Sequence, residues 1–80
     1  MNARAYILIK AEAGKARWKW LHSQLMKVKG VKGVDAVTGT FDFIATIEGE
    51  DFNEIWRTVL EEFQAIDGVV STLTCNVITI

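Results

Sequence analysis

The stretch Thr38-Gly39-Thr40-Phe41-Asp42-Phe43 predicts a turn that opens an apolar strand. Glycine has no Cβ, so backbone amides at such a turn can approach a small ligand closely, and the neighbouring aspartate can accept from an ammonium group. The apolar residues at positions 41, 43, 45 and 47 alternate with a second set, Asp42, Ile44, Thr46 and Glu48. This is the period of a strand with one packed face. The same spacing also fits a plain hairpin turn with an exposed aspartate.

Upstream of this turn, the spacing of apolar residues predicts a strand, a helix and a second strand. Residues alternate over Arg4–Glu12, and Lys15–Lys29 carries apolar residues at three- and four-residue steps, as an amphipathic helix does. Lysines at the end of this helix suit its dipole, and Gly30 is a natural stop. Val34–Thr38 then leads into the turn as a short strand.

Downstream of the turn, a second helix and a final strand are expected. Asp51 with Glu54 three residues later resembles a capping box, which marks a helix start. One broad apolar helix face follows, made of Phe52, Ile55, Trp56, Val59, Leu60 and Phe63. Asp67-Gly68 predicts a turn and Val69–Ile80 a long strand. The order predicts one α+β domain over residues 1–80, a ferredoxin-like βαββαβ antiparallel sheet with two helices on one face.

The sheet face that the helices leave uncovered is also predicted to be apolar. Its expected members are Tyr6, Leu8, Val37, Ile44, Val70, Ile78 and Ile80. An antiparallel sheet with a solvated face alternates cleanly, and apolar area left in water forgoes about 25 cal/mol per Å². A domain of 80 residues has a small core and often oligomerises. We therefore expect a face-to-face dimer, close to a dimeric α/β barrel.

Charge is distributed unevenly along the chain, although the formal net charge is only -1. The basic residues lie almost entirely before position 33 and the acidic residues almost entirely after it. A basic half can indicate nucleic-acid binding, but two neighbouring helices of opposite charge explain the pattern without it. No apolar run approaches the roughly 18 residues that span a bilayer. We expect a cytoplasmic protein with no direct nucleic-acid partner and no membrane partner.

The sequence shows no catalytic constellation, so we expect no enzyme, no metal and no cofactor. His22 is the only histidine, and a general base needs an orienting partner; a packing or surface role is favoured. Cys75 is the lone cysteine and is expected to be a buried, inert thiol. Trp18 and Trp20 point to different sides of a helix, Trp18 to the core and Trp20 to its rim or an interface.

An RNA-recognition module has the same order of strands and helices. Such a module stacks bases on exposed aromatic side chains of its central strands, beside basic residues. Phe41 and Phe43 would share a face here, but Asp42 puts a negative charge where phosphates would approach. This alternative is disfavoured.

Two motifs carry a resemblance to a known family. Gly39-Thr40-Phe41-Asp42-Phe43-Ile44 resembles the G-x-[YF]-D signature of Lrp/AsnC regulators, and residues 67–74 (DGVVSTLT) are similar to their closing G-V-x-x-(S)-T-x-T motif. The resemblance covers essentially the whole chain and only the family's C-terminal effector-binding domain, often called the RAM domain. It implies dimers joined through their sheets, rings of dimers such as octamers or decamers, and a small effector, usually an amino acid, bound between dimers.

The resemblance also implies site residues, by position. Gly39, Thr40 and Asp42 would belong to the effector site, with Thr72 and Thr74 as weaker candidates. Backbone amides beside Gly39 would hold a carboxylate, and Asp42 would accept from an α-ammonium.

Full-length regulators carry a helix-turn-helix domain that an 80-residue chain has no room for, so direct operator binding is not expected. The leading hypothesis is an amino-acid-sensing domain that acts on transcription or metabolism through partners, full-length relatives among them. Two alternatives stay open. One is a small dimeric α/β-barrel enzyme of monooxygenase or isomerase type, with His22 or Asp42 as base, and the other is a purely structural assembly module.

Overall fold

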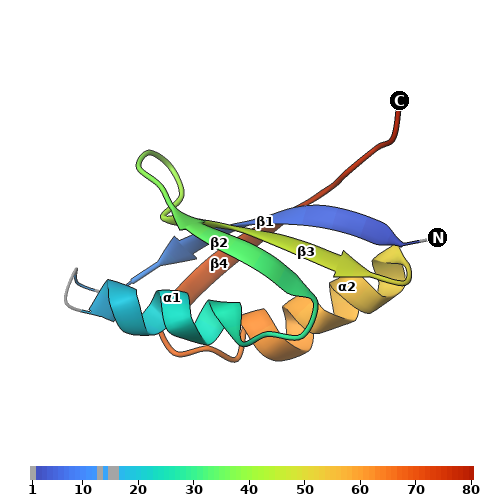
Figure 1. The fold of residues 1–80 in the computed structure, drawn as a ribbon. Coiled ribbons are helices and arrows are strands. Elements are labelled where there is room, and N and C mark those ends of the chain that lie inside the picture. Colours follow the sequence, from blue (N-terminus) through green and yellow to red (C-terminus); the bar gives the residue numbers. More distant parts are fainter. Residues whose placement is uncertain (1, 13, 15–16) are drawn as a thin grey trace.

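The computed structural model describes residues 2–12, 14 and 17–80 of the chain. Figure 1 shows a sheet with both helical segments against one of its faces. The elements are β1 (Ala3–Ala11), α1 (Trp18–Met26), β2 (Val31–Ala36), β3 (Phe43–Gly49), α2 (Phe52–Thr58), its π-helical continuation η2 (Val59–Phe63) and β4 (Val69–Asn76). All strand pairs are antiparallel, in the order β2-β3-β1-β4. The predicted ferredoxin-like fold is confirmed.

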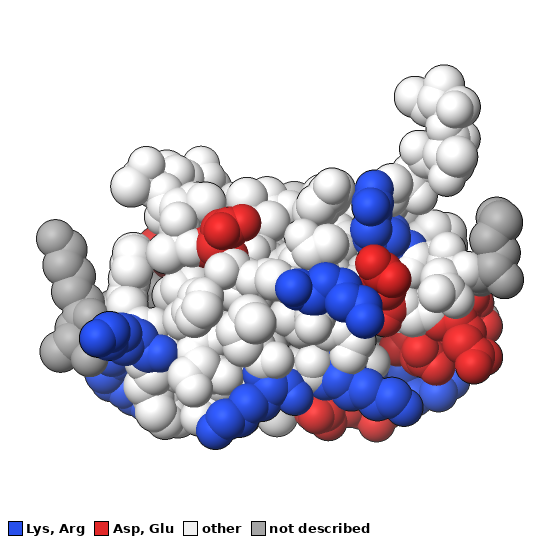
Figure 2. Space-filling model, viewed as in Figure 1, with Lys and Arg blue, Asp and Glu red and all other residues white. Residues whose placement is uncertain are grey.

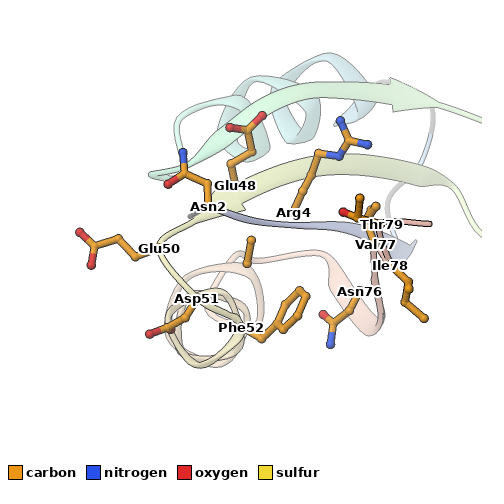
Figure 3. A pocket seen from close by; sticks show the side chains of 11 residues that line it. Asn2, Arg4, Glu48, Glu50, Asp51, Phe52, Asn76, Val77, Ile78 and Thr79 are labelled. Atoms are coloured by element: carbon orange, nitrogen blue, oxygen red, sulfur yellow. The ribbon is translucent and has the colours of Figure 1, made fainter.

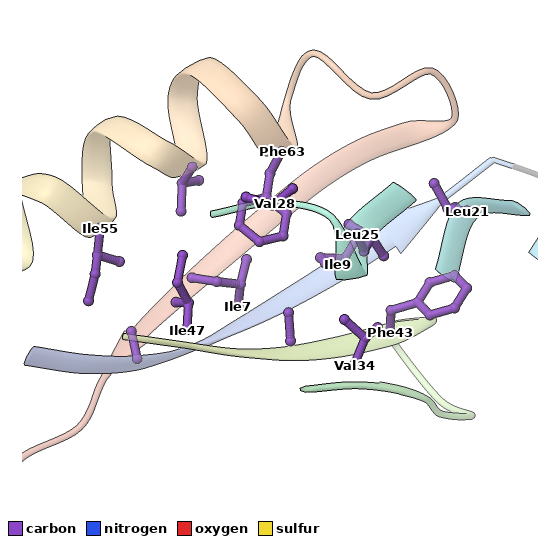
Figure 4. Close-up of a cluster of buried hydrophobic side chains, with 13 residues drawn as sticks. Ile7, Ile9, Leu21, Leu25, Val28, Val34, Phe43, Ile47, Ile55 and Phe63 are labelled. Atoms are coloured by element: carbon purple, nitrogen blue, oxygen red, sulfur yellow. The ribbon is translucent and has the colours of Figure 1, made fainter. Parts of the chain in front are cut away.

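The core lies between the sheet and the helices (Figure 4). Its buried side chains are Ala5, Ile7, Ile9, Leu21, Leu25, Val28, Val34, Phe43, Ala45, Ile47, Ile55, Val59 and Phe63. Every second residue of β1 and β3 contributes, which is the alternation that the sequence predicts. Trp18 packs against this core, with its ring centroid 5.3 Å from that of Phe43.

The start of α2 is fixed by side chains, as the sequence predicts. Asp51 is the N-cap, and its Oδ1 accepts from the backbone N–H of Glu54 at 2.8 Å. Glu54 reaches back in turn, but its Oε1 accepts from the N–H of Glu50 at 3.2 Å, one residue before the cap. One donor of the first turn, the Glu54 N–H, and the Glu50 N–H just before the cap are satisfied in this way.

The turn between α1 and β2 depends on Gly30. This residue has φ +90°, a conformation that L side chains rarely adopt, and a Cβ at this position would lie 2.5 Å from the Glu48 carbonyl oxygen. The Gly30 carbonyl also accepts from the Glu48 N–H at 2.9 Å. Gly30 therefore ties the end of the first helix to β3, which explains why a glycine stands there.

The predicted bounds of four elements are wrong. The helix expected over Lys15–Lys29 spans Trp18–Met26 where the chain is described, and Lys15 lies outside the described residues. The strand expected over Val34–Thr38 is Val31–Ala36, and Phe41 precedes β3. The final strand ends at Asn76, because β1 begins at Ala3 and gives β4 little more to pair with; beyond the strand, the Val77 N–H still donates to the Arg4 carbonyl.

The broad apolar face of the second helix is only half buried. Ile55, Val59 and Phe63 lie in the core, whereas Phe52, Trp56 and Leu60 are exposed by 43, 55 and 46 %. A helix resting on a flat sheet buries one stripe, and these three residues lie beside that stripe. The prediction of one packed face is therefore correct for half of its members.

Charges gather on the helical side of the molecule. Figure 2 shows Lys and Arg along α1 and the following turn, and Asp and Glu gathered where α2 begins. Within the described residues the ion pair Arg17–Asp67 spans 3.3 Å between exposed groups, so its effect on stability is small. No helix of the described chain has the length and apolar character needed to cross a membrane.

Candidate functional site

The predicted effector turn closes the β2–β3 hairpin and is tied to β1 through Asp42. The Asp42 N–H donates to the Ile9 carbonyl at 2.9 Å, and its Oδ2 accepts from the Ala11 N–H at 2.8 Å. The Asp42 carbonyl accepts from the Val37 N–H at 2.8 Å, which closes the base of the turn. Asp42 lies one residue before β3 begins, and its side chain thus extends the β1–β3 ladder beyond the last strand pair, Ile9 with Phe43.

The tip of this turn is open to solvent. Thr38, Gly39 and Thr40 are exposed, and Gly39 has φ +116° with no atom within 4 Å of the place a Cβ would occupy. A left-handed backbone rather than close packing therefore requires glycine at position 39. In Figure 1 the turn projects beyond the sheet, on the side away from the helices. The tip is therefore an exposed turn on a base fixed by Asp42.

The two threonines predicted as weaker site residues lie on β4, with β1 between them and the hairpin. Thr72 is opposite Ile9 and Thr74 opposite Ile7, so both share the helix-covered face of the sheet. The Thr72 Oγ1 accepts from Gln64 Nε2 at 3.5 Å. The Thr74 Oγ1 is buried and has no hydrogen-bond partner in the described part of the chain. The fold groups Gly39, Thr40 and Asp42, and it keeps the threonines apart from them.

The face of the sheet away from the helices carries an apolar patch, which we call the open face. The register places Leu8 of β1 between Ile44 of β3 and Leu73 of β4. Tyr6 and Leu73 are exposed by 41 and 50 %. The expectation of an apolar open face is met for Tyr6, Leu8 and Ile44, whereas Val37, Ile78 and Ile80 lie beyond the ends of their strands. Leu73 also belongs to this face, although the sequence pattern does not indicate it, because its membership follows only from the β1–β4 register.

Cys75 corrects another prediction. The sequence predicts a buried thiol, yet Cys75 is exposed. It lies opposite Tyr6, so it belongs to the open face, while Thr74 occupies the inner position instead. Either residue is small enough for the core, and the register alone decides between them.

His22 holds α1 to the sheet. Its Nε2 is 2.8 Å from the Val34 carbonyl oxygen, to which it donates when that nitrogen carries the proton. A ring nitrogen used in this way serves packing, as the sequence indicates. Within the described residues, no group of three or more His, Cys, Asp or Glu residues is placed to hold a metal ion.

A hollow lies at the other end of the sheet (Figure 3). It measures about 950 Å³ and is bounded by Arg4, Glu48 and Phe52 together with the segment that follows β4. A second, charged hollow of about 610 Å³ lies between Lys29 and Glu62, and a third of about 350 Å³ lies beside Trp20. None of these hollows includes Gly39, Thr40, Asp42, Thr72 or Thr74 in its lining. Sequence patterns give no signal for the first hollow, because Arg4 and Glu48 meet only through the β1–β3 register.

Comparison with protein families then identifies the chain. Residues 4–79 match the model of the Lrp/AsnC ligand-binding domain. The chain belongs to this family. The resemblance noted in the two sequence motifs is confirmed, and it extends over nearly the whole chain.

Three relatives place the domain in different contexts. A homocitrate synthase of Sulfurisphaera tokodaii is 32% identical over 77 residues, which are 96% of this chain but only 16% of the synthase. TTHA0845 of Thermus thermophilus superposes with a TM-score of 0.85 at 24% identity, covering 98% of this chain and 95% of that protein. A transcriptional regulator of Neisseria meningitidis, solved as its L-Met complex, gives a TM-score of 0.84 at 21% identity, over 96% of this chain and 50% of the regulator. At these identities the two structures show a shared fold.

Proposed function

We propose that this chain is an amino-acid-sensing regulatory domain, which assembles into dimers and higher rings and binds its effector between dimers. The observation that carries the proposal is the exposed Gly39–Thr40 turn, held against β1 by Asp42 in a chain of the Lrp/AsnC ligand-binding family. The L-Met complex of the Neisseria regulator, which has the same fold, supports an amino acid as the class of effector.

The turn offers both halves of an amino-acid site. Exposed amides near Gly39 donate to an α-carboxylate, and an α-ammonium is met by Asp42 Oδ1, since Oδ2 already accepts from Ala11. Hydrogen bonds to charged groups contribute about 1.5–3 kcal/mol each. A turn on the surface of one subunit encloses little of a ligand, so a neighbouring dimer is needed to complete the site.

The open face supplies the reason for dimerisation. Leu8, Ile44 and Leu73 form one apolar row across three strands, with Tyr6 beside it. Covering such a face with the same face of a second copy removes apolar area from water on both sides, at about 25 cal/mol per Å². A twofold axis makes this contact self-complementary.

We propose that the domain acts on the protein that it regulates by assembling with it. The match to one segment of a homocitrate synthase supports a metabolic enzyme as one kind of partner, and the regulator match supports full-length Lrp/AsnC relatives as another. In both cases the domain passes on effector occupancy by a change in how its subunits associate.

Calorimetry with a panel of free amino acids tests the ligand claim. The wild type is expected to bind at least one of them, and Asp42→Asn to weaken that binding by about 10- to 100-fold, since one charge-assisted bond is lost. Asp42→Asn retains an oxygen that accepts from Ala11, so the turn keeps its anchor. Glu61→Gln, at an exposed carboxylate of η2 on the helical side of the molecule, is the control and should bind as the wild type does.

Failure of the wild type to bind any member of the panel, under conditions where it is oligomeric, would overturn the ligand claim. The same oligomer would then be a structural assembly module. Equal binding by Asp42→Asn and wild type would remove Asp42 from the site while leaving the effector in place.

A further inference from the structure

The segment that follows β4 is the most exposed apolar part of the described chain. Ile78 is exposed by 81 % and Ile80 fully, more than any other large hydrophobic residue of the described chain. We call residues 77–80 the arm. The bond from the Val77 N–H to the Arg4 carbonyl ties the base of the arm to β1.

The arm leaves the body on the open side of the sheet. Figure 1 shows it continuing the line of β4 and rising away from the helices. Its composition, Val-Ile-Thr-Ile, favours an extended strand. An apolar extended segment in water gains nothing by itself, so this conformation calls for a surface that receives it.

Four extended residues are enough to cross the spacing of two packed sheets. Four extended residues span up to about 13 Å, whereas sheets packed face to face are about 10 Å apart. An arm that rises from one sheet of a face-to-face dimer therefore reaches the other sheet. Ile78 would lie between the sheets and Ile80 at the sheet of the partner.

We propose that residues 77–80 form an exchanged arm, which crosses to a second copy of this chain and packs Ile78 and Ile80 against its sheet. This inference rests on the face-to-face dimer of the proposed function. By twofold symmetry each copy gives one arm and receives one, so the sheet contact and the two arm contacts form together.

Two variants separate the arm from the sheet contact. Ile78→Ser/Ile80→Ser removes the apolar arm and leaves the open face intact, whereas Leu73→Lys puts a charge on the open face and leaves the arm intact. Both sites are exposed in the subunit, so each variant is expected to fold. Met26→Gln, at an exposed residue of α1 on the opposite side of the molecule, is the control.

Sedimentation equilibrium measures the dimer dissociation constant of each variant. The arm variant is expected to dissociate at least about 100-fold more readily than wild type, because four isoleucine side chains per dimer are lost. Leu73→Lys is expected to be monomeric and Met26→Gln to match wild type. A monomeric wild type would overturn both proposals, whereas a Leu73-dependent dimer unaffected by the arm variant would overturn the arm alone.

Amide hydrogen exchange gives a second, independent measurement. In the wild-type dimer the amides of Ile78 to Ile80 are expected to exchange slowly, and in monomeric Leu73→Lys as fast as an unstructured peptide. Fast hydrogen exchange at these amides in the dimer would show a free arm and refute the proposed crossing of the arm to the second copy. Slow exchange in the Leu73→Lys monomer would show an arm folded back into its own hollow beside Phe52, which would refute it as well.

Discussion

Replacing Asp42 with alanine tests whether its carboxylate holds the effector turn. Oδ2 accepts from the Ala11 N–H at 2.8 Å in a partly buried position. A hydrogen bond to a charged acceptor contributes about 1.5–3 kcal/mol. The backbone bonds of residue 42 to Ile9 and Val37 survive the substitution. We therefore expect Asp42→Ala to lower the free energy of unfolding by about 1.5–3 kcal/mol.

Urea denaturation followed by circular dichroism measures this loss. With an m-value of about 1–1.5 kcal/mol per M for a domain of this size, the midpoint should fall by about 1–3 M. All proteins are compared at one concentration, because the stability of an oligomer depends on it. Asp42→Asn retains an oxygen acceptor for Ala11 and should lose roughly half as much.

Glu61→Ala is the control for this measurement. Glu61 is an exposed carboxylate of η2, on the helical side of the molecule, and substitutions at such surface positions change stability by less than about 0.5 kcal/mol. If the free energy of unfolding of Asp42→Ala lies within about 0.5 kcal/mol of that of the wild type, the carboxylate does not anchor the turn. The geometric basis of the proposed effector site would then be refuted.

Three further substitutions test the fold by paired comparison in thermal or urea unfolding. Gly30→Ala should lower the free energy of unfolding by about 2–4 kcal/mol, because the added Cβ meets the Glu48 carbonyl at a positive φ. Gly33→Ala places its Cβ in open space and should leave this free energy nearly unchanged. Equal losses from the two variants would contradict this reasoning. Ile55→Ala should cost about 2–5 kcal/mol and exposed Trp56→Ala much less; the reverse order would mean that α2 buries its other side. Asp51→Ala should cost about 0.5–2 kcal/mol by removing the cap of α2, and no loss would show that the bond to Glu54 is unimportant.

The order of elements could be predicted from the sequence because local patterns determine it. Alternation along β1 and β3 and the Asp51 cap each reflect a short-range physical rule, and the structure contains them. Gly30 lies in the turn before β2, but the helix that it is expected to stop already ends at Met26. Even the family could be inferred, since its two motifs lie at the hairpin and on the last strand.

Features that depend on register could not be predicted. Thr74 and Cys75 are both small, and nothing local decides which one faces the helices; the pairing of β4 with β1, including the irregularity at Lys10 and Ala11, decides it. The apolar face of α2 is wider than the sheet can cover, so its buried stripe could not be separated from Phe52, Trp56 and Leu60.

The anchoring role of Asp42 could not be predicted for a related reason. In the sequence the aspartate next to a glycine turn indicates a ligand contact, and its distance from Ala11 along the chain hides the bond between them. Only the paired strands show that the β1–β3 ladder ends before it can satisfy the Ala11 N–H. A structural role and a proposed ligand-binding role therefore meet in one side chain.

Sedimentation equilibrium of the wild-type chain at micromolar concentration tests the central claim most directly, since an apolar open face requires a second copy to cover it. The mass of one chain is 9.0 kDa. The account predicts twice this mass or a higher even multiple, with Leu73→Lys returning it to that of one chain. A wild-type protein that sediments as a folded single chain at this concentration would contradict it.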